Sequence, residues 1–273
     1  MRSLDYYRFR EEYGESEPMD TSNLTSFVGQ VVLVTGAASG IGKASAELIA
    51  ERGGHVVCLD LNEAGLKTTV AEISAAGGKA SYKVLDVSSQ SGVKKVIAEV
   101  LAEHGQIHAL ANSAGISGPT GKPVEEVDWA AFQKTIEINL YGTVWLTQEL
   151  MPSMKANKYG RIVHLASIAG KEGNPGMSAY NSSKAGVIGF VKGVAKECAT
   201  FGITINAVAP AVIRTPINET VAPDVQAYMV SKIPVGRLGE PNEVAEVIAF
   251  AASKACSFTT GFTFDVSGGR ATY

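Results

Sequence analysis

Short apolar runs alternate along the chain with longer amphipathic stretches. The runs are rich in β-branched residues, and we expect strands near residues 30–35, 55–60, 80–86, 107–111, 160–166, 203–208 and 262–266. The stretches between them repeat apolar positions at helical spacing, as in residues 61–76 and 88–105. This alternation predicts an α/β protein, a doubly wound parallel sheet of about seven strands with helices on both faces.

A polar residue, a glycine or a proline stands at or just after the end of several predicted strands. These residues are Gly36, Asp60, Asp86, Asn112, Ser167 and Pro210. In an open α/β sheet, ligands bind beyond the carboxyl ends of the strands. We therefore expect the functional site at that edge of the sheet.

The first predicted strand runs into a glycine-rich turn, because residues 31–42 read VVLVTGAASGIG. Gly36, Gly40 and Gly42 would allow a tight turn close to a pyrophosphate, and the next helix offers free N–H groups to an anion. The spacing differs from the G-x-G-x-x-G of the general dinucleotide fingerprint. The flanking strand and helix favour phosphate binding over an ordinary tight loop.

Asp60 ends the second predicted strand. A carboxylate at this place can accept hydrogen bonds from both adenosine ribose hydroxyls of NAD, and it would repel the 2′-phosphate of NADP. No Arg or Lys stands at residues 37–39 or 61–62 to bind that phosphate. We predict NAD as the cofactor; the alternative is that Asp60 only caps a helix that begins near Glu63.

Ser167, Tyr180 and Lys184 carry the candidate chemistry. Tyr180 and Lys184 are four residues apart, so they share one face of a helix. A nearby ammonium favours the phenolate and lowers the pKa of a tyrosine, and a serine hydroxyl can bond the reacting oxygen. This set of groups suits proton transfer to and from an alcohol or carbonyl.

Together these motifs resemble the short-chain dehydrogenase/reductase family over about residues 27–269. Asp86-Val87 resembles the pair that meets the adenine, residues 112–115 (NSAG) resemble an Asn-Asn-Ala-Gly strand end, and residues 210–215 (PAVIRT) resemble a Pro-Gly-x-x-x-Thr segment. The resemblance implies a Rossmann-like fold and an NAD site. The implied cofactor-binding residues are Gly36, Ser39, Gly40, Ile41, Gly42, Asp60, Leu61, Asp86, Val87, Asn112, Ala114, Gly115, Tyr180, Lys184, Pro210, Ile213 and Thr215.

The same resemblance implies a catalytic group of Asn139, Ser167, Tyr180 and Lys184. Tyr180 would be the acid–base, and Lys184 would lower its pKa and hold the nicotinamide ribose. Ser167 would orient the substrate oxygen, and Asn139 would hold a water that links Lys184 to solvent. Thr215 would bond the carboxamide of the nicotinamide.

Two positions depart from the family pattern. Ser113 replaces the second Asn of the strand end, and Ala211 replaces the Gly after Pro210. If the backbone at Ala211 needs a positive φ, the alanine costs about 1 kcal/mol. Neither departure removes a catalytic group.

Composition narrows the class of protein further. At 273 residues with 45% apolar content, one domain over residues 27–273 is expected, and the net charge of −3 argues against a nucleic-acid surface. The sequence has no apolar run of membrane-spanning length and no secretory signal pattern. The three cysteines are far apart and odd in number, so we expect reduced thiols in a cytoplasmic protein. Residues 1–26 are polar and acidic and are interpreted as a flexible tail, or as a segment that docks on a neighbouring subunit.

Charged and amide side chains in the predicted substrate loops favour a small hydroxyl-rich or carboxylate-bearing substrate. The candidates are Lys171, Asn174, Arg214 and Arg270, and an Arg could hold a carboxylate in a bidentate fork. Residues 216–237 resemble the family's substrate lid. The catalytic half and the SGGRATY ending are similar to family members that oxidise sugar acids, such as 2-keto-3-deoxy sugar acids, or polyols. The alternatives are a 3-oxoacyl-acyl carrier protein reductase and an NAD-binding sensor without turnover.

The remaining predictions concern assembly and the histidines. The resemblance and the apolar residues spread around the helix after Tyr180 predict a homotetramer, or at least a dimer. His104 and His108 are separated by Gly105, so no metal site is predicted. His164 lies on the strand that leads to Ser167 and is interpreted as a packing histidine.

Overall fold

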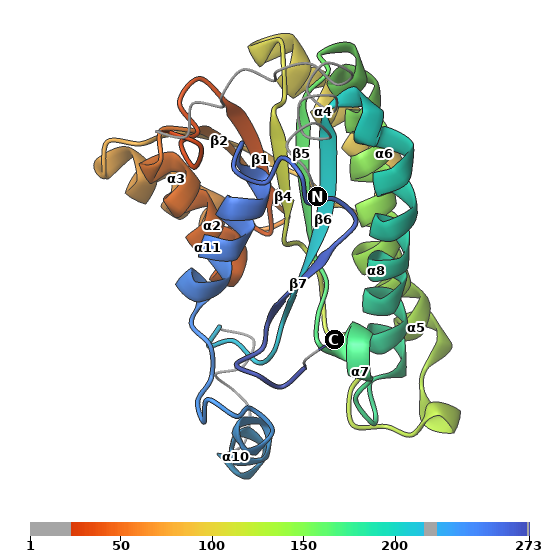
Figure 1. Cartoon of the computed structure of the whole chain (residues 1–273). Coiled ribbons are helices and arrows are strands. Elements are labelled where there is room, and N and C mark those ends of the chain that lie inside the picture. The colour runs from red at the N-terminus through yellow and green to blue at the C-terminus, as the bar shows by residue number, and fades with distance from the viewer. Residues whose placement is uncertain (1–22, 216–222, 272) are drawn as a thin grey trace, which may run out of the picture.

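A parallel sheet forms the centre of the computed structural model, which describes residues 23–215, 223–271 and 273. Within these residues seven strands pair in parallel in the order β3-β2-β1-β4-β5-β6-β7 (Figure 1). The strands are β1 (Val31–Thr35), β2 (His55–Asp60), β3 (Lys79–Val84), β4 (Ala109–Asn112), β5 (Gly160–Leu165), β6 (Ile203–Pro210) and β7 (Thr263–Val266). The order reverses between β1 and β4, and ligands of such sheets bind at that switch point.

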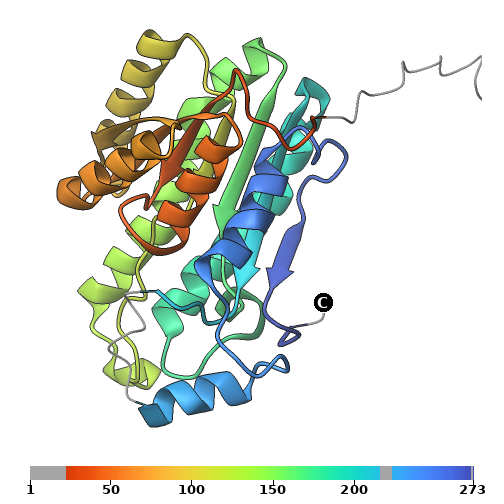
Figure 2. The same ribbon diagram turned by 90° about the vertical axis from the view of Figure 1, so that its left-hand side faces the viewer.

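Helices cover both faces of the sheet. One layer consists of α2 (Gly40–Glu51), α3 (Glu63–Ala75) and α11 (Pro241–Ala252), and Figure 2 looks onto this layer. The other layer consists of α4 (Gln90–His104), α6 (Gly142–Ala156) and α8 (Ser178–Cys198) (Figure 1). Shorter elements surround the ends of the strands: η1 (Val124–Glu126), α5 (Trp129–Ile136), η2 (Glu137–Tyr141), α7 (Ala169–Glu172), η3 (Ala199–Phe201) and α10 (Pro223–Ser231).

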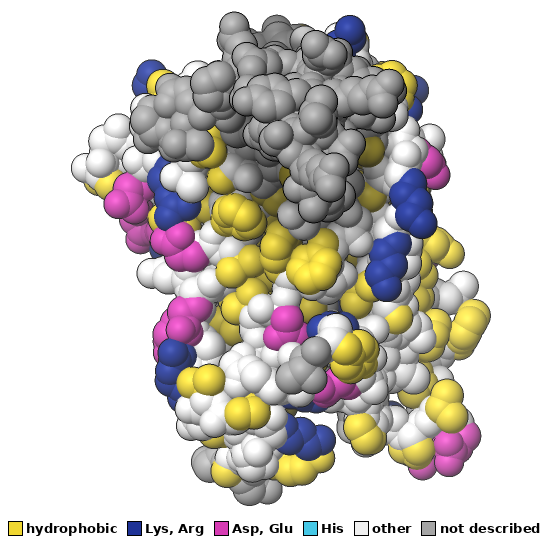
Figure 3. All heavy atoms as spheres, viewed as in Figure 1, with side chains coloured by type: hydrophobic (Ala, Val, Ile, Leu, Met, Phe, Trp, Pro, Cys, Tyr) yellow, Lys and Arg dark blue, Asp and Glu magenta, His cyan; other side chains and the backbone are white. Residues whose placement is uncertain are grey.

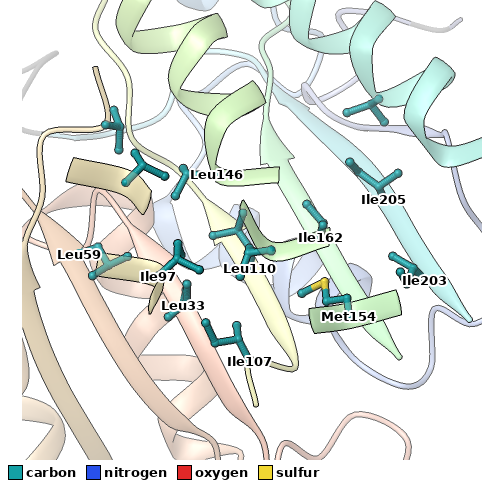
Figure 4. Close-up of a cluster of buried hydrophobic side chains, with 14 of the residues drawn as sticks. Leu33, Leu59, Ile97, Ile107, Leu110, Leu146, Met154, Ile162, Ile203 and Ile205 are labelled. Atoms are coloured by element: carbon teal, nitrogen blue, oxygen red, sulfur yellow. The ribbon is translucent and has the colours of Figure 1, made fainter. Parts of the chain in front are cut away.

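Two hydrophobic cores result, one under each helical layer. Leu33, Leu110 and Ile162 from the strands pack against Ile97 and Leu146 of α4 and α6 (Figure 4). The opposite faces of the same strands pack against α2, α3 and α11. Because each central strand is buried on both sides, its sequence is a nearly continuous apolar run.

The predicted fold class, a doubly wound parallel sheet in one α/β domain, is confirmed. The strands lie within a few residues of their predicted positions. Most of the predicted N-terminal tail lies outside the described residues, but its end is attached, because Ala255 N donates to Leu24 O at 3.1 Å. Among the described helices none has the length and apolar content needed to cross a membrane.

Candidate active site

A cavity of about 490 Å³ opens at the carboxyl ends of the strands. Most of the residues predicted to bind the cofactor line it. These residues are Gly36, Ser39, Gly40, Ile41, Gly42, Asp60, Leu61, Asp86, Val87, Ala114, Gly115, Tyr180, Lys184, Pro210, Ile213 and Thr215. Ser167, Asn174 and Arg270 line it as well, so nucleotide, catalytic and substrate candidates face one space.

The glycine-rich turn leaves room for an anion where β1 meets α2. Gly36 has φ +67° and Gly40 has φ +54°, which favour glycine because a side chain would be strained there. A Cβ on Gly42 would lie 2.1 Å from Gly36 O, so the first turn of α2 packs directly on the loop. The N–H groups at the start of α2 therefore approach the cavity without side chains in the way, which fits a pyrophosphate.

Asp60 connects the turn after β2 to the glycine-rich loop. Its Oδ2 accepts a hydrogen bond from Ala38 N at 3.2 Å, and its Oδ1 accepts one from Asn62 N at 2.9 Å. The residue that caps α3 is Asn62, whose side chain accepts from Gly65 N. The alternative reading of Asp60 as a helix cap is therefore wrong, and its carboxylate lines the cavity as a ribose site requires.

No basic side chain lines the cavity near Asp60 in the described part of the chain. The two cations in the lining, Lys184 and Arg270, belong to the catalytic and substrate end. Lys43, one turn into α2, is paired with Glu72 at 2.5 Å. Within the described residues, the predicted ribose site thus offers a carboxylate and no basic partner for a 2′-phosphate.

Lys184 and Tyr180 lie one turn apart on α8. Lys184 is buried, and its Nζ donates to Leu165 O at 2.6 Å. Burial lowers the pKa of this lysine to about 8. The ammonium lies 5.7 Å from the centroid of the Tyr180 ring, so its positive charge is close to the phenol.

Ser167 follows β5 and faces the phenol of Tyr180. Burial raises the pKa of Tyr180, and a hydrogen bond with Ser167 acts in the opposite direction. The hydrogen bond with Ser167 therefore lowers the phenol pKa, and the additional effect expected of the Lys184 charge stays a prediction. A hydroxyl that supports the phenolate and an ammonium nearby are the parts an acid–base tyrosine needs.

Asn139 lies in the π-helical turn η2 and is buried beside the cavity. Its Oδ1 accepts from Ile116 N at 2.9 Å, and its Nδ2 donates to Ile116 O at 2.9 Å and to Ser183 Oγ at 3.0 Å. Both amide hydrogens are therefore used by protein atoms. The side chain fixes the loop after β4, and it has no amide hydrogen left for the predicted water.

Asn112 is the predicted cofactor residue that does not line the cavity. Its side chain points into a buried network, where its Oδ1 accepts from Thr35 Oγ1 at 2.6 Å. Its Nδ2 donates to Thr143 Oγ1 at 3.0 Å and to His164 Nδ1 at 3.1 Å. Sequence reasoning did not assign Thr35, Thr143 or His164 to the site. For Thr35 and His164 the available signal was a polar residue inside an apolar strand, and Thr143 lies on α6.

The substrate candidates divide into two groups. Arg270 and Asn174 line the cavity and contact each other, since Arg270 Nη2 donates to Asn174 Oδ1 at 2.7 Å. Lys171 lies outside the lining, where it pairs with Asp265 at 3.0 Å. Arg214 also lies outside it, exposed and paired with Glu240 at 3.0 Å. The prediction that Lys171 and Arg214 face the substrate is not supported by their positions.

The backbone at Ala211, the predicted lid and the apolar lining of the cavity concern three earlier predictions. Lys158 is the one non-glycine residue with a positive φ in the described ranges, so Ala211 carries no backbone strain. Of the predicted lid, residues 216–222 lie outside the described residues, while Met229 of α10 lines the cavity. Several apolar lining residues, among them Met177 and Ile116, were not predicted.

The fold and the cavity define an α/β oxidoreductase that binds a nicotinamide dinucleotide. A family model described as "Enoyl-(Acyl carrier protein) reductase" matches residues 36–271. Over 247 residues the chain is 47% identical to the 2-dehydro-3-deoxy-L-rhamnonate dehydrogenase (NAD(+)) of a Sphingomonas species, covering 90% of this chain and 97% of the relative. The chain therefore belongs to the short-chain dehydrogenase/reductase family.

Two further comparisons agree. The chain is 41% identical over 242 residues to the 3-oxoacyl-acyl-carrier-protein reductase FabG of Thermotoga maritima, covering 88% of this chain and 97% of the relative. The crystal structure of gox2181 has a TM-score of 0.88 and 33% identity, covering 91% of this chain and 98% of that one. The predicted family and reaction class, oxidation and reduction at CH–OH groups, are confirmed. The predicted cofactor NAD agrees with the name of the Sphingomonas relative.

Proposed function

We propose that this protein is an NAD-dependent dehydrogenase that interconverts a secondary alcohol and a ketone on a sugar acid, such as a 2-keto-3-deoxy sugar acid. The observation that carries the substrate class is Arg270, whose side chain is 8% exposed and lines the cavity with Ser167 and Tyr180. The Sphingomonas relative, named for a keto-deoxy sugar acid and NAD(+), supports the same assignment.

Arg270 is held in place before any substrate arrives. Its Nε donates to Glu172 Oε2 at 3.0 Å, and its Nη2 donates to Asn174 Oδ1 at 2.7 Å. A guanidinium has five N–H donors, so these two bonds leave others for a ligand. Because Glu172 offsets the charge of the arginine, recognition of a carboxylate rests mainly on oriented hydrogen bonds.

The described residues fit an NAD molecule, because the glycine turn is open and Asp60 faces the ribose end. When bound, the nicotinamide supplies the hydride acceptor. During oxidation Ser167 orients the alcohol oxygen, and the phenolate of Tyr180 takes the hydroxyl proton. Lys184 holds positive charge beside the phenolate, which favours the ionised form.

The test is NADH formation across sugar acids, polyols and secondary alcohols, with NAD and NADP in parallel. We expect turnover of a sugar acid with NAD. In Arg270→Met we expect the KM for the acid to rise roughly 10- to 100-fold, the loss expected for a charge-assisted hydrogen bond. The KM for an uncharged polyol should stay unchanged.

Arg52→Met is the matched control, because Arg52 is also a partly buried arginine paired with a glutamate, Glu246, but lies away from the cavity. It should leave both KM values unchanged. Equal effects of Arg270→Met on acid and polyol would refute the carboxylate role. Activity with NADP on 3-oxoacyl thioesters would move the assignment to the reductase alternative, which the Thermotoga relative favours. Absence of turnover on every substrate would favour the sensor.

The same proposal includes a cytoplasmic homotetramer. Phe250 and Phe262 are exposed, and their rings contact Phe264 of the edge strand β7; Figure 3 shows hydrophobic side chains gathered on this face. A patch of aromatic rings on a sheet edge is typical of a subunit contact. The three free, buried cysteines support a reducing compartment. A sedimentation mass of one chain would refute the tetramer.

A further inference from the structure

A network of buried hydrogen bonds lies below the cavity, between β1, β4, β5 and α6. Its centre is the side chain of Asn112, which ends β4, and the imidazole of His164 lies beside it on β5. Both side chains are buried, and His164 has no exposed surface. Each side chain of this network has a hydrogen-bond partner within it.

The tautomer of His164 follows from its neighbour Thr147. The hydroxyl of Thr147 donates its proton to Thr143 O at 2.8 Å, so it can only accept from His164 Nε2, which lies 2.9 Å away. A neutral imidazole with a proton on Nε2 has an acceptor at Nδ1. Asn112 Nδ2 donates to that nitrogen at 3.1 Å.

The orientation of the Asn112 amide follows in turn. With Nδ2 facing His164, its Oδ1 faces Thr35 Oγ1 and accepts the hydroxyl proton at 2.6 Å. The oxygen of Thr35 is then free to accept from Ala114 N at 3.0 Å. If the amide turned over, the Thr35 proton would lose its acceptor, and two donors would compete for one oxygen.

The surroundings of His164 keep the imidazole neutral. Burial lowers its pKa to about 3, and the positive charge of Lys184 acts in the same direction. The ring of Phe190 covers it edge-on at 6.3 Å between centroids. No carboxylate of the described residues is hydrogen-bonded to it, so Nδ1 stays an acceptor at working pH.

We propose that His164 is a positioning residue: its Nδ1 fixes the amide of Asn112 and thereby holds the loop at residues 113–115 against the glycine-rich turn. Ala114 and Gly115 of that loop line the cofactor cavity, as does Gly36 directly after Thr35. His164 therefore acts on dinucleotide binding without touching the dinucleotide. This role goes beyond the packing role that the sequence suggested and is independent of the substrate.

Two amide substitutions separate the two ring nitrogens. In His164→Asn the side-chain oxygen can take the place of Nδ1 and accept from Asn112. In His164→Gln the longer amide can take the place of Nε2 and contact Thr147, but it leaves Asn112 Nδ2 without that acceptor. We expect NADH affinity, measured by fluorescence titration, to fall about tenfold in the Gln variant, since a buried donor loses its partner, and to stay near wild type in the Asn variant.

A stability role alone would give a different result. Both variants lose one ring contact, so both should lower the melting temperature by similar amounts. His108→Gln is the control at the opposite end of the sheet, where His108 Nδ1 accepts from Val31 N at 3.0 Å; we expect it to lower stability without changing NADH affinity. Equal NADH affinity in the Asn and Gln variants, or the weaker affinity in the Asn variant, would overturn the proposal.

A measurement on the unaltered protein tests the same point if a variant fails to fold. In the ¹⁵N spectrum of histidine-labelled protein, His164 should show a protonated Nε2 and an unprotonated Nδ1, with no titration near neutral pH. A proton on Nδ1 would reverse the Asn112 assignment and refute the role of His164.

Discussion

The buried charge of Lys184 should lower the free energy of unfolding of the cofactor-free protein. Lys184 is 3% exposed, and among the described residues its Nζ has a hydrogen bond to Leu165 O and lies 5.7 Å from the centroid of the Tyr180 ring. No carboxylate among the described residues forms an ion pair with it. We therefore predict that Lys184→Met, which keeps the length of the side chain and removes the charge, raises the stability of the cofactor-free protein while it abolishes turnover.

The magnitude follows from the lysine pKa, which falls from 10.5 to about 8. Each pKa unit corresponds to about 1.36 kcal/mol, so the buried ammonium costs about 3 kcal/mol at neutral pH. The substitution also leaves Leu165 O without its donor, which costs about 1–2 kcal/mol. The net gain is about 1–2 kcal/mol, or a rise of several degrees in Tm.

The pH dependence gives a second readout. Because the folded pKa lies below the unfolded one, the unfolded chain binds more protons between about pH 8 and 10.5. The wild-type stability therefore rises with pH across this window. The advantage of Lys184→Met should be complete below pH 8 and should disappear above about 10.5.

Urea unfolding of both proteins without cofactor, at several pH values, measures this difference. Lys171→Met is the matched control: Lys171 is also largely buried, at 8% side-chain exposure, but pairs with Asp265 at 3.0 Å. Removing one partner of that pair should destabilise the protein. A Lys184→Met variant that is less stable than wild type at neutral pH would refute the reasoning.

Two further substitutions test the cavity. Gly42→Ala should abolish NADH binding and lower stability, because its Cβ would lie 2.1 Å from Gly36 O, whereas Gly193→Ala on α8 has nothing within 4 Å and should leave binding intact in the same titration. Tyr180→Phe should lower kcat by about 10²–10⁴-fold, the range of general acid–base catalysis. Its NADH affinity, measured by fluorescence, should change little, and a kcat near wild type would exclude Tyr180 as the acid–base.

The fold could be predicted because each level of the sequence points to the same answer. The apolar run at Val31–Thr35 has the composition of a buried parallel strand, and Gly36 then permits the turn that its φ of +67° requires. The α3 cap was harder, because Asp60 and Asn62 are both good capping residues and stand two positions apart. Their roles are separated by the contact of Asp60 with Ala38, which is distant in sequence.

The sequence predicts the site best where the functional residues lie on the same helix or strand. Tyr180 and Lys184 share a helix face, so their spacing alone brings them together. The substrate side was less predictable, because partners distant in sequence decide whether a cation reaches the cavity: Arg270 is paired with Glu172 and lines it. Asp265 pairs with Lys171, and Glu240 pairs with Arg214, and neither partner is close in sequence.

The polar groups of the site differ in how much hydrogen-bonding capacity they keep, and this difference separates two kinds of residue. Both amide hydrogens of Asn112 and of Asn139 are used by protein atoms, so these side chains can fix loops but have no donor left for a ligand. Arg270 and Lys184 keep free N–H donors at the cavity wall, and free donors are what a ligand binds. Asn112 and Asn139 therefore act by positioning the loops of the site. Their substitution should weaken dinucleotide binding and turnover together, whereas substitution of Arg270 should change the choice of substrate alone.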